Sequence, residues 1–336
     1  MSKTSLFRYK DGAAPNFAAL LYAAACYGAG LWLITVPSLA ANLLGMLLVA
    51  HTLVIAAYFI HEFAHGSIFA KPQANDRAGE IAAWITGACF ASYAGLKEKH
   101  LRHHADRLDV VTFDYRAFLR RQPGWVTRLV LALEWAYIPA VELIMHGFVI
   151  MSQFTRKEPA RQKRALLMLA SRLAFFALLA GVAAKALLFY AAAYLIFLQV
   201  LRFMDAFQHT YDVYAAHDLA PTPAALVRDR AYEHANTYSN VLSISNPLLN
   251  LLTLNFAYHN AHHARPAVPW HDLPGLHGKL YGDDHTQILT ARELIGSYHR
   301  NRLRRVTDPD YGAVTAEGDR AAGFVGAVGV SFLTAV

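Results

Sequence analysis

Two long runs of uncharged, apolar residues near the start of the chain constrain its fold more than any other feature. Residues 17–36 and 39–60 contain no Asp, Glu, Lys or Arg, and each is long enough to cross about 30 Å of hydrocarbon as a helix. A segment in lipid must satisfy its own backbone hydrogen bonds, so we expect both runs to be helical. Pro37 and Ser38 lie between them and predict a tight hairpin. The first run is too long for the core of a signal peptide and has no small-x-small cleavage site after it.

A second hairpin is expected later in the chain. The apolar sequence from Leu166 to Phe203 is long enough for two more spans, near 166–182 and 186–204. Lys185 falls at the predicted turn, where a long basic side chain can extend to the membrane interface. The sequence therefore predicts four spans in two hairpins.

Two further apolar stretches are weaker candidates for crossing the membrane. Residues 80–96 are short, and residues 129–151 contain Glu134, Glu142 and His146, which are costly in lipid. We expect helices here that lie at the interface or pack against protein. With 55% hydrophobic and only 16% charged residues, the predicted fold is an all-α integral membrane protein with interfacial helices and a His-rich cap.

An even number of spans places residues 1–16, residues 61–128 and the chain after about residue 204 on one side of the membrane. Basic residues are concentrated in these segments, which makes that side cytoplasmic, in a bacterial inner membrane. They include Lys97, Lys99, Arg102, Arg120, Arg121, Arg300, Arg302, Arg304 and Arg305. The net charge of +7 is then explained by topology and attraction to lipid headgroups, and no motif for nucleic-acid binding accompanies it.

The domain organisation is expected to be simple. We predict a cytoplasmic N-terminal segment at 1–16, one membrane domain at 17–310 and a C-terminal tail at 311–336, for which the sequence suggests no function. The two cysteines, Cys26 and Cys89, lie in apolar surroundings, so neither a disulfide framework nor a thiolate metal site is expected.

The sequence that follows the second span carries the first chemical signal. His61-Glu62-x-x-His65 fits the helical pattern of zinc proteases, in which two histidines bind Zn²⁺ and the glutamate is the general base. The same letters also fit one part of a larger, histidine-rich metal site. The other histidines distinguish these readings.

Three more histidine groups lie on the predicted cytoplasmic side. Residues i, i+3 and i+4 share one face of a helix, so each cluster presents its imidazoles together. A zinc protease needs three protein ligands. Together with His61 and His65 these groups supply nine histidines, which suits two metal ions instead. Imidazole binds iron, zinc and copper alike, so spacing alone does not name the metal. The additional histidines are His100, His103 and His104, then His209 after the fourth span, then His259, His262 and His263.

The motifs HEFAH, HLRHH and HNAHH closely resemble the three histidine boxes (HxxxH, HxxHH, HxxHH) of the membrane fatty acid desaturase superfamily. They occur at matching intervals between similar pairs of apolar spans, over residues 40–275. AFQHTYD resembles the segment that precedes the third box in acyl-lipid desaturases, which supports His209 as an extra ligand. Where that family usually has a further histidine, this chain has Tyr211.

The resemblance implies a non-haem di-iron centre that uses O₂ to introduce a double bond into a lipid acyl chain. By analogy the two irons are bound by His61, His65, His100, His103, His104, His209, His259, His262 and His263. Electrons would come from a separate ferredoxin-like or cytochrome b5-like donor, since the chain has no fused cytochrome b5 signature. The acyl carrier stays open among glycerolipid, acyl carrier protein and coenzyme A.

Four residues are candidates for supporting the metal ligands. Glu62 could fix the tautomer of a neighbouring imidazole. Asp205 and Asn255 each lie four residues before a predicted ligand, so each could hold water or orient a ligand. His234 lies in the cytoplasmic segment YEHANTYSN and could position a ligand or a substrate headgroup.

Alternative functions stay open at this point. A hydroxylase or a carotenoid ketolase of the same superfamily would share every motif. An intramembrane zinc metalloprotease would use only HEFAH and a distant third ligand, and it predicts that His103→Ala and His262→Ala retain activity. A metal-binding or transport protein would bind metal without consuming O₂.

Overall fold

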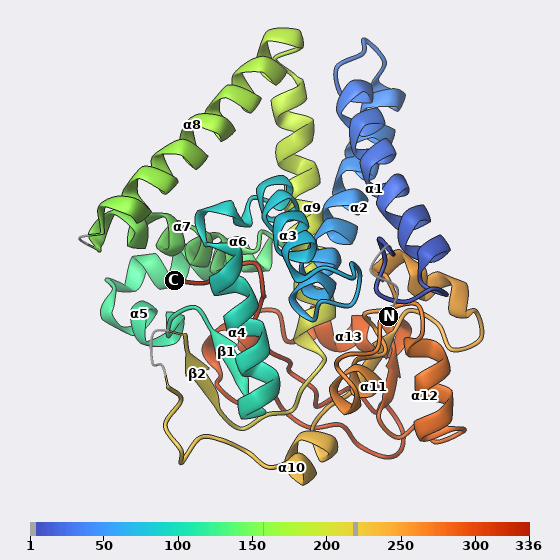
Figure 1. Cartoon of the computed structure of the whole chain (residues 1–336). Helices are drawn as coiled ribbons and strands as arrows, with labels where there is room; N and C mark the ends of the chain where they lie inside the picture. Colours follow the sequence, from blue (N-terminus) through green and yellow to red (C-terminus); the bar gives the residue numbers. More distant parts are fainter. Residues whose placement is uncertain (1–4, 157, 218–220) are drawn as a thin grey trace.

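The computed structural model describes residues 5–156, 158–217 and 221–336, so the first four residues of the predicted N-terminal segment lie outside the described residues. Within these described ranges, four helices are long and apolar enough to cross a membrane, by length and composition. They form two hairpins that project from one side of the molecule, with a cap at their other end (Figure 1). The prediction of four apolar helices in two hairpins is confirmed. They are α1 (Ala13–Leu33), α2 (Leu39–Ala64), α8 (Pro159–Val182) and α9 (Ala186–Ala206).

The turns of the two hairpins are tied to each other. Ser38 caps α2 by accepting a hydrogen bond from the backbone of Ala41. Asn42 donates to the Leu33 and Val36 carbonyls, and Lys185 at the second turn donates to Asn42 Oδ1 at 2.9 Å. Satisfying the polar groups at these turns with side chains keeps the hairpins together where the backbone cannot pair with itself.

The remaining helices and strands lie mainly in the cap and at its boundary with the four apolar helices (Figure 1). The four strands are short and form two parallel pairs, β1 with β2 and β3 with β4. The helices are α3 (Pro72–Thr86), η1 (Ala88–Phe90), α4 (Tyr93–Asp106), α5 (Tyr115–Arg121), α6 (Gly124–Trp135), α7 (Ala140–Thr155), α10 (Arg230–Ala235), η2 (Pro247–Thr253), α11 (His259–Ala264), α12 (Leu273–Tyr281), α13 (Ala291–Arg300) and α14 (Arg304–Thr307). The strands are β1 (Asp109–Val111), β2 (Tyr214–Ala216), β3 (Ser239–Val241) and β4 (Ile288–Thr290).

Neither of the two weaker apolar stretches forms one continuous helix. The 80–96 stretch is interrupted at Gly87, which has φ +82° and ends α3, and a new helix begins after Ser92, whose side chain caps α4. The 129–151 stretch is interrupted near Tyr137, which has φ +60°. Left-handed backbone cannot continue an α-helix, so neither stretch forms one straight segment.

Packing against protein explains the acidic residues of the second stretch. Glu134 on α6 and Glu142 on α7 are buried and both accept hydrogen bonds from Arg202 on α9. A buried carboxylate is tolerated when it is paired and hydrogen-bonded. This ion-pair cluster connects α6 and α7 to the cap-facing end of α9.

The core lies around the second half of α2, which packs against α1, α3 and α9. Its first half and much of α8 instead expose large apolar side chains such as Leu44, Leu47 and Leu178, as expected of lipid-facing helices. Residues 324–336, within the predicted C-terminal tail, are mostly buried in the same body. The buried end of α2 carries the first histidine motif.

Candidate metal centre

Four segments from distant parts of the sequence meet to form the site. His61 and His65 lie at the cap-facing end of α2, and α4 and α11 each carry three histidines on one side. His209 comes from the segment directly after α9. The short α11 is buried and packs near α10 and α12, so tertiary contacts hold this one-and-a-half-turn helix in place.

The nine predicted histidines separate into two clusters with converging ring nitrogens. Within each cluster the candidate ligand atoms all lie within 4.8 Å of one another. Histidines that are adjacent in the sequence belong to different clusters, because adjacent side chains on a helix point about 100° apart. The first cluster, site A, consists of His61, His65, His100, His104 and His262, and the second, site B, of His103, His209, His259 and His263.

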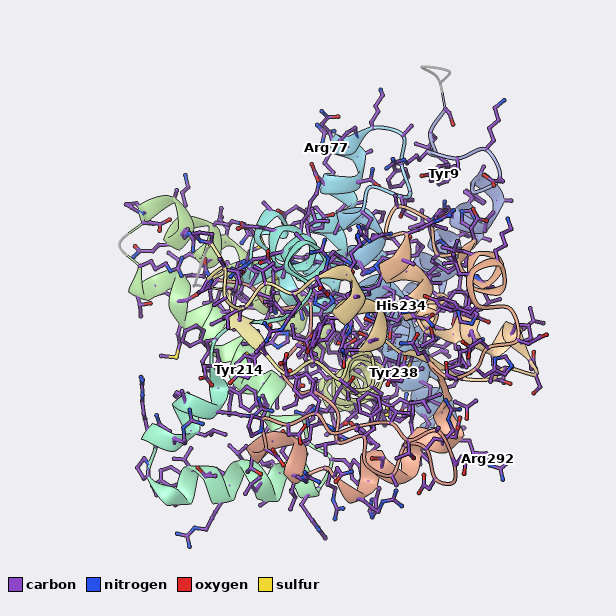
Figure 2. All side chains as sticks on the ribbon, turned by 90° about the horizontal axis from the view of Figure 1, so that it is seen from below. Tyr9, Arg77, Tyr214, His234, Tyr238 and Arg292 are labelled. Carbon is purple, nitrogen blue, oxygen red and sulfur yellow. The ribbon has the colours of Figure 1, made fainter. Side chains whose placement is uncertain are left out.

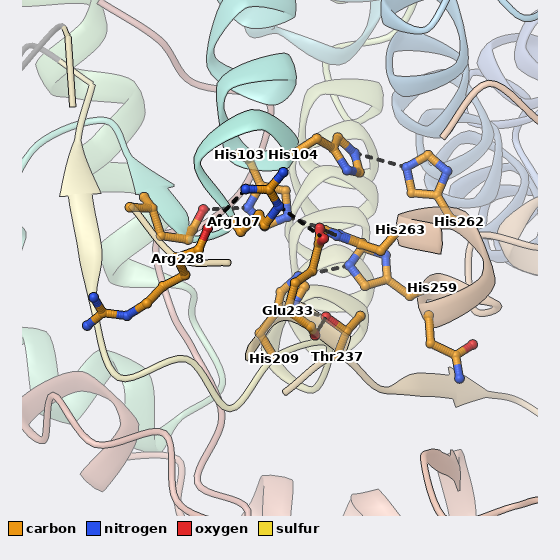
Figure 3. Close-up of polar contacts among 12 residues, drawn as sticks. His103, His104, Arg107, His209, Arg228, Glu233, Thr237, His259, His262 and His263 are labelled. Atoms are coloured by element: carbon orange, nitrogen blue, oxygen red, sulfur yellow. Dashed lines mark hydrogen bonds and ion pairs between the residues drawn. The ribbon is translucent and has the colours of Figure 1, made fainter. Parts of the chain in front are cut away.

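The Nε2 atoms face the centre of each cluster. In site A, Nε2 of His65 lies 2.6 Å from that of His100, and Nε2 of His61 lies 3.0 Å from that of His262. In site B, Nε2 of His209 lies 2.9 Å from that of His259. Figure 3 shows the histidines of α4 and α11 pointing toward one another. Such convergence suits a cation at the centre of each cluster, which the Nε2 lone pairs would bind in place of facing one another.

Several outer ring nitrogens have partners that fix ring orientation, whereas Nδ1 of His104, His259 and His262 has none among the described residues. Nδ1 of His103 donates to the Leu108 carbonyl at 2.8 Å, and Nδ1 of His263 lies 2.8 Å from Glu233. Nδ1 of His61 lies 3.1 Å from Glu62. A hydrogen bond at Nδ1 leaves the Nε2 lone pair directed inward, which is the arrangement found around metal-ligating histidines.

Burial favours the neutral form of eight of these imidazoles, among them the following seven. Desolvation, with further repulsion from His263, lowers the pKa of His103 to about 3. Desolvation and neighbouring imidazoles hold six other pKa values well below the ordinary value, those of His65, His100, His104, His209, His259 and His262. Neutral imidazole is the form that binds metals, so the donor set of both clusters fits two metal ions.

The four predicted supporting residues differ in position. Glu62 is buried and accepts hydrogen bonds from Ser67 Oγ and the Trp270 backbone, in addition to its contact with His61. Asp205 is buried, and neither of its carboxylate oxygens has a partner in the described part of the chain. Both residues lie in contact with the site or with the cavity beside it.

Asn255 and His234 are less closely connected to the histidines. Asn255 has φ +54° and donates to the Trp270 carbonyl, while its Oδ1 is buried without a partner among the described residues. His234 is exposed on α10, at the end of the molecule away from the apolar helices (Figures 1 and 2). Its ring lies near Tyr281, with centroids 6.1 Å apart.

Several residues beside the histidines were not predicted from the sequence. Glu233, the neighbour of His234, contacts both His263 and Arg107 (Figure 3). Asp109 lies 3.5 Å from Nδ1 of His103, and the Tyr211 ring stacks on His209 with centroids 4.1 Å apart. A carboxylate directly beside a candidate histidine is a weak signal for Glu233, and nothing local in the sequence distinguishes the other contacts.

A small cavity with both polar and apolar walls touches both clusters. Its volume is about 40 Å³, which is room for a few water molecules. Asp109, Asp205 and Gln208 each direct at least one buried polar atom without a described partner toward this region. The cavity is also lined by Lys99, His100, His103, Val110, His209, Phe256, His259, Val330 and Phe332.

Four apolar helices in two hairpins, with two adjacent all-histidine clusters at their cap-facing end, define a membrane-type protein whose histidine clusters are able to bind metal. The family model described as fatty acid desaturase matches residues 37–291, well over half of the chain. The chain therefore belongs to the fatty acid desaturase family, a family of di-iron oxidoreductases, which confirms the resemblance seen in its motifs. No curated protein sequence gives a significant match to the chain.

Proposed function

We propose that this protein is an O₂-dependent di-iron enzyme that introduces a carbon–carbon double bond into the acyl chain of a lipid. The observation that carries the proposal is the pair of all-imidazole clusters, five histidines in site A and four in site B, in a chain of the desaturase family. Two irons bound there would supply the O₂-dependent redox chemistry that zinc cannot.

The protein's own residues have defined tasks in this proposal. The neutral imidazoles hold the metals without cancelling their positive charge, and Glu62 and Glu233 keep His61 and His263 oriented. Asp109 and Asp205 offer carboxylate oxygens in the cavity beside both clusters, where they can hold water or accept a proton. Burial of the clusters limits the access of bulk water to the reacting atoms.

The contacts of Glu62 weigh against the zinc protease reading of HEFAH. A general base must reach a water molecule in the site, whereas the Glu62 carboxylate is buried and engaged by Ser67, Trp270 and His61. Nε2 of His262 also lies 3.0 Å from Nε2 of His61 in site A, so HEFAH shares its site with the third histidine motif. Both facts support a role for Glu62 in orienting a ligand.

The membrane setting supports an acyl substrate. The clusters lie at the ends of α2 and α9, helices that are apolar enough to span a bilayer, so a lipid chain can approach without leaving an apolar environment. We propose an inner-membrane protein of a bacterium with the metal sites on the cytoplasmic side, where a ferredoxin-like or cytochrome b5-like donor supplies electrons. The basic residues of the cytoplasmic segments favour this topology.

Mass spectrometry of total lipids tests the reaction. Aerobic cells expressing the wild-type chain or His262→Ala, with a ferredoxin and its reductase supplied, are compared with cells lacking the protein. A new acyl species lighter by two hydrogens, present only with the wild type, is expected, and its fragmentation locates the double bond. A species heavier by one oxygen would instead establish a hydroxylase, and activity retained by His262→Ala would contradict the di-iron proposal.

A further inference from the structure

The end of the described chain fills the space beside the metal centre. Residues 326–336 form neither helix nor strand, yet almost all of them are buried. Leu333, Thr334 and Ala335 are 1–2% exposed, less than many residues of the helices. Val330 and Phe332 of this segment line the cavity that touches both histidine clusters.

The segment runs from α9 across the face of site A to α4. Ala327 donates its backbone N–H to the Ala206 carbonyl at the end of α9, and Val330 reaches the cavity that contains Asp205. The Phe332 ring then lies 6.1 Å from that of His61 and 6.5 Å from that of His100, centroid to centroid. Phe332 is therefore in ring contact with two candidate ligands.

Side chains hold this segment in place. Lys99 is buried and donates from Nζ to the carbonyls of Ser331 and Thr334, each at 2.8 Å. The hydroxyl oxygens of Thr112 and Thr334 lie 2.6 Å apart. Among the described residues, no backbone–backbone hydrogen bond joins 328–336 to the rest of the chain. Removing the segment would therefore break a few side-chain contacts and no sheet or helix ladder.

An acyl chain has no room beside the metals while the segment is present. The cavity touching both clusters measures about 40 Å³, and the cavity next to it along α9 about 10 Å³. Pockets that bind ligands of ordinary size measure about 300–1,000 Å³. Part of the protein must move before a substrate chain can reach the histidine clusters. Residues 328–336 lie against the cavity and have no backbone–backbone hydrogen bond to the rest of the described chain.

We propose that residues 327–336 are a displaceable occupant of the acyl-chain site, held by a latch of Lys99 and Thr112, and that a lipid acyl chain enters by replacing them. This inference rests on the proposed function. The exchange is energetically feasible because the acyl chain re-covers the apolar walls that Val330, Phe332 and Leu333 leave. When the segment leaves, the Lys99 ammonium group loses its two carbonyl acceptors, but the Asp109 and Asp205 carboxylates in the same cavity still compensate its charge.

A reversible disulfide tests the displacement. Thr112→Cys and Thr334→Cys, introduced together in a chain with Cys26→Ala and Cys89→Ala, bring two thiols within bonding reach because the native hydroxyls already touch. The iron-loaded protein is placed in lipid nanodiscs with a phospholipid carrying a photoreactive acyl chain. In the oxidised, locked form, product formation and acyl labelling of α9 are both expected to fall at least tenfold, while the iron content stays unchanged. Both are expected to recover when the same sample is reduced.

The two readouts separate this inference from the proposed function. If no acyl product forms in any state but labelling still depends on the lock, the displacement stands and the proposed reaction fails. If the locked form is labelled and turns over as fast as its reduced form, the segment is a fixed wall and the inference is overturned.

A single substitution covers the case in which the double variant does not fold. Leu333→Cys in the same cysteine-free chain places one buried thiol in the segment. Its reaction with a soluble maleimide is expected to accelerate at least tenfold when acyl lipid is added at saturating concentration. An unchanged labelling rate would mean that the segment stays in place, contrary to the inference.

Discussion

The carboxylate of Glu233 lies 2.8 Å from Nδ1 of His263, although 30 residues separate them in the sequence. Its other oxygen lies 3.5 Å from Nε of Arg107, at the end of α4. The carboxylate thus connects α4 and α10 to α11, and so links the helices that carry the second and third histidine motifs. It also directs the Nε2 atom of His263 toward His103.

Substitutions at the adjacent residues Glu233 and His234 test whether the contact between Glu233 and His263 supports metal binding. Glu233→Gln removes the charge that orients His263, so we expect metal affinity at site B to fall by about 10–100-fold. His234→Ala changes an exposed residue and is expected to leave the affinity unchanged. Competition with a chelator, followed by metal analysis, measures both, and the reverse order of effects would support the role first suggested for His234.

Separate metal sites predict separate losses. His262→Ala removes a ring from site A and His259→Ala one from site B, so we expect each variant to lose about one of two irons, because the other site keeps its complete set of imidazoles. Elemental analysis of the purified proteins gives the stoichiometry. The exposed His285→Ala serves as a histidine control with full iron content. Full iron content in either cluster variant would contradict the assignment of that cluster.

The Arg202 ion-pair cluster is expected to be essential for stability. Arg202→Met leaves Glu134 and Glu142 buried without their partner, which costs about 3–5 kcal/mol. The triple variant with Glu134→Gln and Glu142→Gln removes the stranded charges and should recover much of that loss. Thermal unfolding in detergent compares the variants. Equal Tm values for the single and triple variants would show that the stranded carboxylates do not cause the loss, and a wild-type Tm for the single variant would show that the pairing is unimportant.

The metal-free protein should lose stability on acidification. The pKa of His103 is lowered from its ordinary value to about 3, so between about pH 6.5 and pH 3 the unfolded chain binds the proton that the folded chain excludes. The free energy of unfolding therefore falls as the pH falls through this window, by about 1 kcal/mol per pH unit for each such histidine.

Thermal unfolding of the apoprotein at pH 7.5 and 5.5 measures this dependence. His103→Gln keeps a polar side chain that does not titrate, so its loss of Tm on acidification should be smaller than that of the wild type. An equal loss in both proteins would show that His103 does not contribute to it.

Local sequence was sufficient to predict the spans and the chemical class of the site. Length and apolar composition are properties of a continuous segment, and the costs of charge and of unpaired backbone in lipid act on that segment alone. Histidines at i, i+3 and i+4 likewise share a helix face wherever the helix lies. The boundaries of α6 and α7 were not predicted, because the pairing of Glu134 and Glu142 with Arg202 joins three separate helices.

Only the tertiary structure decided how the nine histidines divide. The adjacent His103 and His104 belong to different clusters, as do His262 and His263. Helix geometry points neighbouring side chains apart, but which rings they then meet depends on how α2, α4 and α11 pack. The same holds for Glu233 and for the C-terminal segment against site A. Contacts across 30 to more than 200 residues depend on packing that no local pattern records, and these contacts orient the ligands and close the space beside them.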